Sequence, residues 1–426
     1  MNEKYKTDMK KYLPDFIFLI SIVIFHVFGY EFFGDDVGVK EQLADTLMDE
    51  LRVLNHVCDN WSSRIIINPV IYIVTHFDYR VWMVINISAW MTIFETALYL
   101  CFGKNVENKT RWIFLVSMLM FPFEITVSVG WITCSITYVW TAAAALISLV
   151  SVRKYIENER LKWYQVFSVF VCGVFAANEE ELSVTLTIIF GTAWIAGLIY
   201  KKSNPTFFMQ FFISVYNVFL HLLSKGNQVR QGLELAGNEN KNMYQQNIFG
   251  KIGVGLMTTL NRLFIQSDYV VLIMLVVMLV TFIVARKYMP ACILIVPLLL
   301  CISGTFVELS NNQLLSVITL LETVSLICIL VSVFWLREVN MNAVILCTSL
   351  IAVGSGRAVV GFANNATGPY DRTYTYLYLF IVAMLSVLLN KLYRLLQDKK
   401  NEAFVLMMFV AGIFAWVRTF FALGII

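Results

Sequence analysis

Long apolar stretches, separated by short polar connections, recur along the whole chain. Most are about 20 residues long, which is the length that a helix needs to cross a hydrocarbon core about 30 Å thick. The shorter alternating segments of a transmembrane barrel are missing from the pattern. Because lipid cannot satisfy the polar groups of an open backbone, we expect spanning helices. The pattern predicts an all-α, polytopic transmembrane bundle that forms one domain over residues 1–426.

The apolar stretches predict about thirteen spans. They cover residues 14–33, 80–102, 112–129, 136–152, 163–178, 182–200, 205–223, 267–285, 290–307, 314–335, 341–360, 373–390 and 402–420. The apolar segment 65–77 is too short to cross alone, so we expect it to be re-entrant or interfacial. The last stretch ends close to Ile426, and no soluble C-terminal domain is expected.

Charge separates the connections into two kinds. Only 14% of the residues are charged, against about 25% in soluble domains. If the N-terminus is cytoplasmic, the cytoplasmic segments hold 20 of the 32 Lys and Arg residues, as the positive-inside rule requires. We therefore expect a multi-pass protein of the cell membrane with a cytoplasmic N-terminus. No stretch is basic enough to indicate nucleic-acid binding.

Three of the connections expected on the outer side are long, at 34–79, 224–266 and 361–372. In the first, leucines recur at helical spacing on one face, with charged residues on the opposite face. The leucines are Leu43, Leu47, Leu51 and Leu54. This spacing predicts an amphipathic helix that lies on the outer membrane surface. The loop 224–266 is the second large outer loop.

The sequence Gly34-Asp35-Asp36, at the outer end of the first span, is the main candidate for catalysis. Of two adjacent carboxylates, one can accept a proton from an attacking hydroxyl while the other binds a hydroxyl or a metal. The competing interpretation is structural: Asp36 caps the amphipathic helix that follows. The two interpretations are compatible.

Aromatic and basic residues near other outer ends are candidates for substrate binding. Arg64 can grip phosphate oxygens with its planar fork, and Trp61 offers a flat face to a sugar ring. Trp131 and Tyr138 flank a short outer turn. For all of these, the alternative is an anchor in the aromatic and basic belt of the membrane interface.

Further candidates lie between or after later spans. Glu179 belongs to a run of three glutamates between two apolar stretches, where carboxylates are costly unless water or a partner reaches them. A solvated hinge is the alternative there. Arg230 and Arg372 are two more candidate phosphate ligands.

Taken in order, these motifs resemble those of the GT-C class of polytopic membrane glycosyltransferases, in an uncharacterised bacterial branch. The resemblance is carried by the acidic pair, the amphipathic first outer loop and a set of later motifs. The motifs are Trp61-Ser-Ser-Arg64, Gly130-Trp131 with Tyr138-Val-Trp140, Asn178-Glu179, Lys225-Gly226-Asn227 with Arg230, and Tyr370-Asp-Arg372. The resemblance runs across most of the chain, and the absence of a sizeable soluble C-terminal domain is a departure from many members.

The resemblance implies a GT-C-like fold in a bacterial plasma membrane and a sugar donor linked to polyprenyl phosphate. The sugar would pass with inversion to a lipid or glycan acceptor of the cell envelope, at the outer face. Asp35 or Asp36 would be the general base or contribute to a metal site. Some members use a divalent metal and others do not. The sequence leaves the cofactor open, with Asp36 and Glu179 as candidate ligands.

Two alternatives remain. A surface-polysaccharide polymerase or ligase, or an acyltransferase, also combines many spans with outer arginines; an acyltransferase would need a membrane-facing histidine, and His26 and His221 lie at or within spans. A lipid-linked-sugar transporter or flippase would need polar groups at the midplane, where Glu95 and Glu322 are ionisable.

Overall fold

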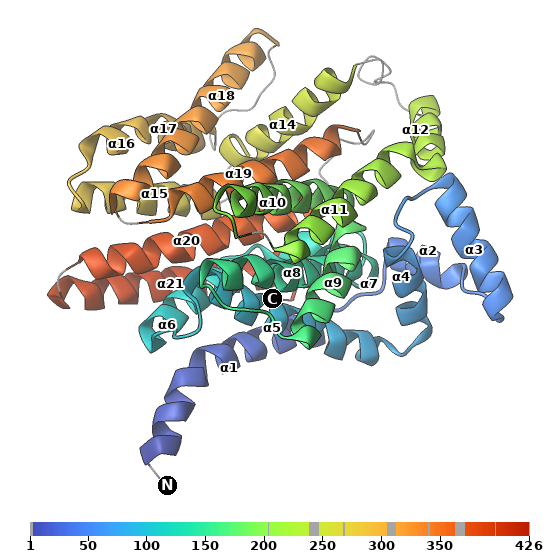
Figure 1. The fold of residues 1–426 in the computed structure, drawn as a ribbon, viewed down its shortest axis with the longest axis horizontal. Helices are drawn as coiled ribbons and strands as arrows, with labels where there is room; N and C mark the ends of the chain where they lie inside the picture. Colours follow the sequence, from blue (N-terminus) through green and yellow to red (C-terminus); the bar gives the residue numbers. More distant parts are fainter. Residues whose placement is uncertain are drawn as a thin grey trace.

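The computed structural model is built of helices joined by turns and short loops, and no strand occurs in the residues that it describes. Those residues are 3–202, 204–237, 247–266, 269–304, 312–339, 341–362, 371–396 and 398–425. Figure 1 shows the helices packed side by side in one bundle, from which the N-terminal part of α1 projects. The predicted all-α bundle is confirmed.

Eight helices or continuous helical runs within the described residues are long and apolar enough to cross a membrane. Each overlaps one of the predicted spans. They are formed by α1 (Glu3–Gly29), α5 (Tyr79–Phe102), α7, η2 and α8 (Trp131–Cys134, Ser135–Trp140 and Thr141–Ile156), α10 (Glu180–Ile199), α11 with the start of α12 (Pro205–Leu223 and Lys225–Gly237), α18 with η3 (Asn312–Trp335 and Leu336–Val339), α19 with η4 (Ala343–Ala358 and Val359–Phe362), and η5 with α20 (Asp371–Tyr374 and Thr375–Leu395).

The other five predicted spans coincide with elements that are bent or whose apolar part is shorter. These are α6 with η1 (Asn108–Leu119 and Phe123–Val127), α9 (Trp163–Ala177), α15 (Tyr269–Val284), α16 with α17 (Tyr288–Ile293 and Ile295–Gly304), and α21 (Asp398–Ala422). Proline disfavours a helical residue before it, and α6 ends shortly before Pro122. The axis of α14 (Ile248–Phe264) meets that of α15 at 76°. The count of thirteen spans therefore stays a prediction.

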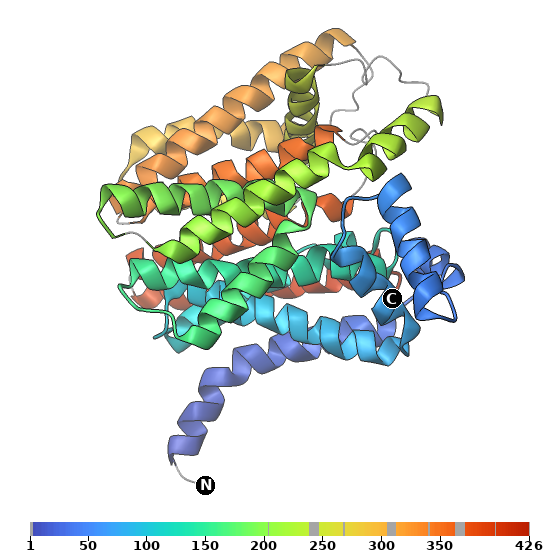
Figure 2. The ribbon, with the colours of Figure 1, turned by 45° about the vertical axis from the view of Figure 1, so that its right-hand side comes forward.

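Connections that the charge pattern assigns to the cytoplasm contact one another. Lys104 forms an ion pair with Glu159 at 2.5 Å, and Lys202 donates to Asn158 at 2.9 Å. Farther along the chain, Lys287 pairs with Glu338 at 2.8 Å. Such contacts are expected when alternate connections meet at the same end of a bundle. Figure 2 shows α2, α3 and α4 together at another end, away from the N-terminus of α1.

In the segment 34–79, the structure differs from the predicted single amphipathic helix. The expected amphipathic helix is broken into α2 (Asp35–Glu41) and α3 (Leu47–Asn60), with Leu43 in the break. The physical reason is the cap at Thr46, whose side chain accepts the N–H of Asp49 at 3.2 Å. Leu47 and Leu51 are exposed on α3, as an interfacial helix requires. The short segment 65–77 contains a separate helix, α4 (Ile67–His76).

The ionisable side chain of Glu95 is paired within the bundle. Arg111 donates from Nη1 to Glu95 at 3.3 Å and to Asp15 at 2.5 Å. Because one guanidinium serves both carboxylates, the three residues join α1, α5 and α6. This pairing gives Glu95 a structural partner, as a charged group at membrane depth requires.

Close packing of α10 against α19 depends on Gly356. A Cβ at this position would lie 2.4 Å from the Thr185 hydroxyl and 2.6 Å from the Glu181 carbonyl oxygen. Small residues at helix contacts let two backbones approach in this way. The approach also lets the next residue, Arg357, reach across to α10.

We expect Gly356→Ala to destabilise the bundle by about 1–3 kcal/mol, because the added methyl group forces α19 away from a backbone carbonyl. Gly354→Ala is the matched control on the same helix, since a Cβ there meets nothing within 4 Å. Thermal unfolding of the purified protein in detergent compares the two. Equal midpoints for both variants would contradict the packing argument.

Candidate functional site

The Gly34-Asp35-Asp36 turn packs against the turn at Gly130. This contact brings together two motifs that are far apart in the sequence. Gly34 has a φ of 58°, and a Cβ there would lie 2.7 Å from the Val129 carbonyl oxygen. Gly130 has a φ of 117°, and a Cβ there would lie 2.6 Å from the Asp36 carboxyl carbon. Both positions therefore need glycine, for its backbone freedom and for the missing side chain.

Asp36 caps the helical run that begins at Trp131. Its carboxylate accepts the N–H of Ile132 at 3.1 Å, and it accepts the N–H and the hydroxyl of Thr133 at 2.8 Å each. The residue is 1% exposed, and burial raises the pKa of the carboxyl group while the hydrogen bonds from Thr133 and Ile132 oppose the rise. A negative charge at a helix N-terminus is stabilising.

The capping role was expected for a different helix. The N-cap of α2 is Gly34, which makes no side-chain cap, whereas Asp36 caps from outside the run that it stabilises. Asp35 precedes it on the same turn and is exposed. Its backbone N–H donates to the Val129 carbonyl at 2.8 Å. The pair therefore consists of one buried, hydrogen-bonded carboxylate and one that faces outward.

Trp131 is buried, with 3% of its surface exposed. Its indole N–H donates to the carbonyl of Gly29 at 2.7 Å, and its ring lies 5.6 Å from His26 and 6.1 Å from Trp82. Trp131 therefore has a packing role, because its side chain connects the end of α1 to the start of the capped run.

Arg64 is held by the glutamates at the start of α10. Its Nε and Nη2 lie 2.8 Å and 2.7 Å from one carboxylate oxygen of Glu180, and Nη2 lies 3.9 Å from Glu179. Burial alone would lower the pKa of Arg64, but the charges of these carboxylates outweigh it and raise the pKa well above its usual value. Arg64 and Glu179, two predicted site residues, are thus brought together.

Glu179 is the N-cap of α10. Its side chain accepts the N–H of Leu182 at 2.9 Å. Burial raises the pKa of the Glu179 carboxyl well above its usual range, and the neighbouring carboxylates Glu181 and Glu180 raise it further. The solvated hinge that the sequence left open as an alternative is therefore wrong for Glu179, which is buried and engaged by the helix start.

Tyr138 lies in the π-helical segment η2. The charges of Arg64 and Arg372 both act on its hydroxyl group. One turn earlier, Arg372 and the aspartate pair Asp35–Asp36 act electrostatically on the thiol of Cys134. Seven of the nine predicted site residues therefore belong to Trp131–Trp140, hydrogen-bond to it or act on it electrostatically: Asp35, Asp36, Arg64, Trp131, Tyr138, Glu179 and Arg372. A π-helical turn in such a place is common at functional sites.

Trp61 and Arg230 form a separate pair, where α3 meets α12. The guanidinium of Arg230 lies 4.8 Å from the centre of the Trp61 ring, which is the geometry of a cation–π contact. The two residues were predicted separately as a sugar platform and a phosphate ligand. In the structure these two residues contact each other. Trp61 lies three residues before Arg64 in the sequence.

Arg357 is a buried charge that the sequence analysis missed. It is 1% exposed, and its Nη1 lies 3.1 Å from Glu181 and donates to the Thr373 carbonyl at 2.7 Å. Its guanidinium also lies 4.0 Å from the centre of the Tyr374 ring. One sequence signal could have identified Arg357: it is an arginine near the end of an apolar stretch, directly after Gly354-Ser355-Gly356.

A second buried polar network surrounds Ser63. Its hydroxyl lies 2.7 Å from Nδ1 of His221 and accepts the side-chain N–H of Asn227 at 2.9 Å. The other ring nitrogen of His221 lies 3.4 Å from the Ala177 carbonyl. The network fixes the loop after α3 to the end of α11 and the start of α12.

The candidate metal ligands do not fit a metal site. Among the described residues, no group of three or more His, Cys, Asp and Glu side chains is placed to hold an ion. Both carboxylate oxygens of Asp36 accept hydrogen bonds, and Glu179 is engaged by the start of α10.

Comparison of the chain with protein-family models, with curated proteins and with solved structures finds no match. The assignment of a function therefore depends on the geometry of the site.

We expect Asp36→Asn to destabilise the protein by about 1–3 kcal/mol, because an amide nitrogen would then face backbone N–H groups that need an acceptor. Asp35→Asn, one residue away and exposed, is the control and should change stability little. Thermal unfolding in detergent measures both. If the two variants melted alike, the capping role of Asp36 would be wrong.

A double-mutant cycle tests the buried pair of Glu181 and Arg357. Either single substitution, Glu181→Gln or Arg357→Gln, leaves a buried charge without its partner and should cost about 3–5 kcal/mol. The double substitution should cost clearly less than the sum, because neither charge remains. Additive losses in thermal unfolding would show that the two residues do not interact.

Proposed function

We propose that the protein is a GT-C-like membrane glycosyltransferase, which moves a sugar from a polyprenyl-phosphate donor to a hydroxyl group of a cell-envelope acceptor. The observation that carries the proposal is the grouping around Trp131–Trp140. There an exposed carboxylate, Asp35, lies on a fixed turn. Asp35 and Arg372 both act electrostatically on the Cys134 thiol, and Arg64 and Arg372 both act on the Tyr138 hydroxyl.

In the proposed reaction, Asp35 is the general base. The acceptor oxygen attacks the anomeric carbon of the donor sugar and transfers its proton to the carboxylate. The bond between the anomeric carbon and the phosphate oxygen breaks, and the configuration is inverted. Asp36 acts as a positioning residue, since its hydrogen bonds to the capped run fix the turn that carries Asp35.

The lipid phosphate is the proposed leaving group, and positive charge is needed where its negative charge develops. Arg372 and Arg64 both act electrostatically on the Tyr138 hydroxyl, so both charges are available beside this part of the π-helical segment. Arg64 is oriented by Glu180, which favours a fixed guanidinium over a mobile one. Prearranged donors of this kind stabilise a transition state more than solvent does.

The test is release of polyprenyl phosphate by the purified protein from a polyprenyl-phosphate-linked sugar in the presence of an acceptor. Asp35→Asn should lower the rate by about 100-fold or more, as expected when a general base is lost, while thermal stability stays close to that of the unchanged protein. Asp49→Asn, an exposed carboxylate of α3, is the control and should keep full activity.

Full activity of Asp35→Asn would contradict the proposed role of Asp35. Uptake of an unchanged lipid-linked sugar by proteoliposomes, without release of polyprenyl phosphate, would contradict the enzyme and favour the transporter alternative.

A further inference from the structure

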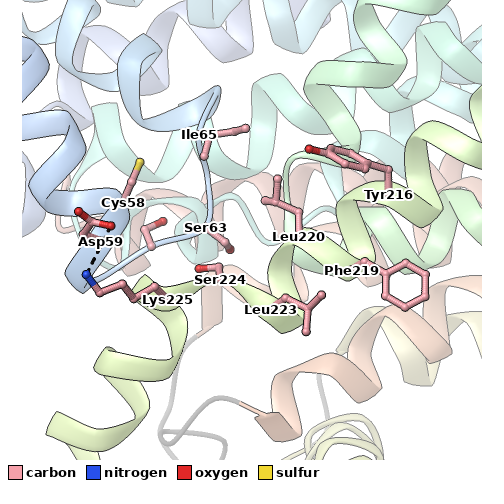
Figure 3. Close-up of a pocket in the computed structure, with 11 residues that line it drawn as sticks. Cys58, Asp59, Ser63, Ile65, Tyr216, Phe219, Leu220, Leu223, Ser224 and Lys225 are labelled. Atoms are coloured by element: carbon pink, nitrogen blue, oxygen red, sulfur yellow. Dashed lines mark ion pairs between the residues drawn. The ribbon is translucent and has the colours of Figure 1, made fainter.

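A pocket of about 410 Å³ lies where the end of α3 meets the end of α11 and the start of α12 (Figure 3). One wall is apolar and comes from the last turns of α11. The opposite side is polar and comes from α3, the loop after it and the start of α12. The side chains that matter are Tyr216, Phe219 and Leu223 on the apolar wall, and Asp59, Ser62, Ser224 and Lys225 on the polar side.

The pocket lies at a boundary between apolar and polar surface on a helix suited to span a membrane. The helical run Pro205–Arg230 is one of the candidate spans, and its residues Tyr216, Phe219 and Leu223 are exposed. On a spanning helix, large exposed apolar side chains face the lipid chains. Directly after them, Ser224 and Lys225 begin the polar segment. The occupant therefore meets hydrocarbon on one side and the headgroup region on the other.

The charges at the polar side come as a pair. The Lys225 ammonium lies 3.8 Å from the Asp59 carboxylate, and both side chains are more than half exposed, at 71% and 60%. Figure 3 shows the two side chains reaching toward each other at one edge of the pocket. A partner with only negative charge would gain from Lys225 but would be repelled by Asp59.

Two hydroxyl groups stand beside this pair. Ser62 accepts the backbone N–H of Arg64 at 3.2 Å, and Ser224 accepts the backbone N–H of Asn227 at 3.2 Å. A hydroxyl whose oxygen accepts in this way keeps its own hydrogen for donation. An ammonium and two hydroxyl donors suit the oxygens of a phosphate diester, and the carboxylate suits an ammonium group.

We propose that this pocket binds a zwitterionic phospholipid whose headgroup carries a phosphate diester and a primary ammonium, as in phosphatidylethanolamine. The phosphate binds Lys225, Ser62 and Ser224, the ammonium binds Asp59, and an acyl chain lies along the apolar wall of α11. The site is independent of the proposed glycosyl transfer, because neither Asp35 nor Arg372 lines it.

The test is native mass spectrometry of the full-length protein. The protein is incubated in detergent with equimolar phosphatidylethanolamine and phosphatidylglycerol that carry the same acyl chains, and the lipids that stay bound after removal of the detergent are identified. Phosphatidylethanolamine should be retained about tenfold better, as one charged hydrogen bond allows. Asp59→Asn should remove most of this preference, and Lys225→Ala should weaken retention of both lipids. Asp49→Asn and Arg52→Ala, on the same helix α3, should leave the preference unchanged.

Several results would overturn the proposal. Equal retention of the two lipids, or an unchanged preference in Asp59→Asn, would contradict the proposal that the pocket recognises a zwitterionic headgroup. Competition by soluble phosphoethanolamine as strong as that of the lipid would show a headgroup site without a lipid. Displacement of phosphatidylethanolamine by polyprenyl phosphate, dependent on Lys225, would make the pocket a donor site. Size-exclusion chromatography of each variant verifies that the exposed substitutions leave the fold intact.

Discussion

The carboxylate of Asp36 at the start of the run from Trp131 to Ile156 is the interaction on which the site depends. It joins segments 96 residues apart and closes the backbone N–H groups that a helix leaves open at its first turn. Gly34 and Gly130 exist at this contact because any side chain there would strike the partner segment. The cap fixes the start of the run and therefore the place of Tyr138, where the influence of Arg64 and Arg372 overlaps.

The three consecutive glutamates at the start of α10 show how one short motif can organise several parts of a bundle. Successive residues of a helix point about 100° apart, so neighbours in the sequence reach different partners. Glu179 caps the helix itself, Glu180 binds Arg64, and Glu181 binds Arg357. Of the two ion pairs, only that of Glu181 and Arg357 is fully buried; a buried pair adds little net stability compared with apolar packing, yet removing one partner is costly. We infer that the main effect of these ion pairs is to determine which helices contact each other, and that their contribution to the stability of the bundle is small.

The sequence predicted what depends on local pattern. Apolar length located the helices, and the charge asymmetry assigned the connections 103–111 and 153–162 to the same side. These two connections do meet, at the ion pair of Lys104 and Glu159. The sequence alone could not predict contacts that depend on how the helices pack. The partner of Asp36 is 97 residues away at Thr133, and Arg357 sits within an apolar stretch whose approach to α10 is set by Gly356. The break in the first outer loop was missed because the leucine spacing continues through Thr46, whose cap ends the continuity.

The short segment of Ser63 and Arg64 connects the two polar regions of the molecule. Ser63 lines the pocket at the end of α3 and bonds to His221 and Asn227, while Arg64 binds Glu180. Because Ser63 and Arg64 are adjacent and both side chains are held, the Ser63 network and the contact of Arg64 with Glu180 fix the same short piece of backbone. Residues that share such a network are energetically coupled. The loop after α3 is therefore held at both ends, by the pocket network on one side and by the start of α10 on the other.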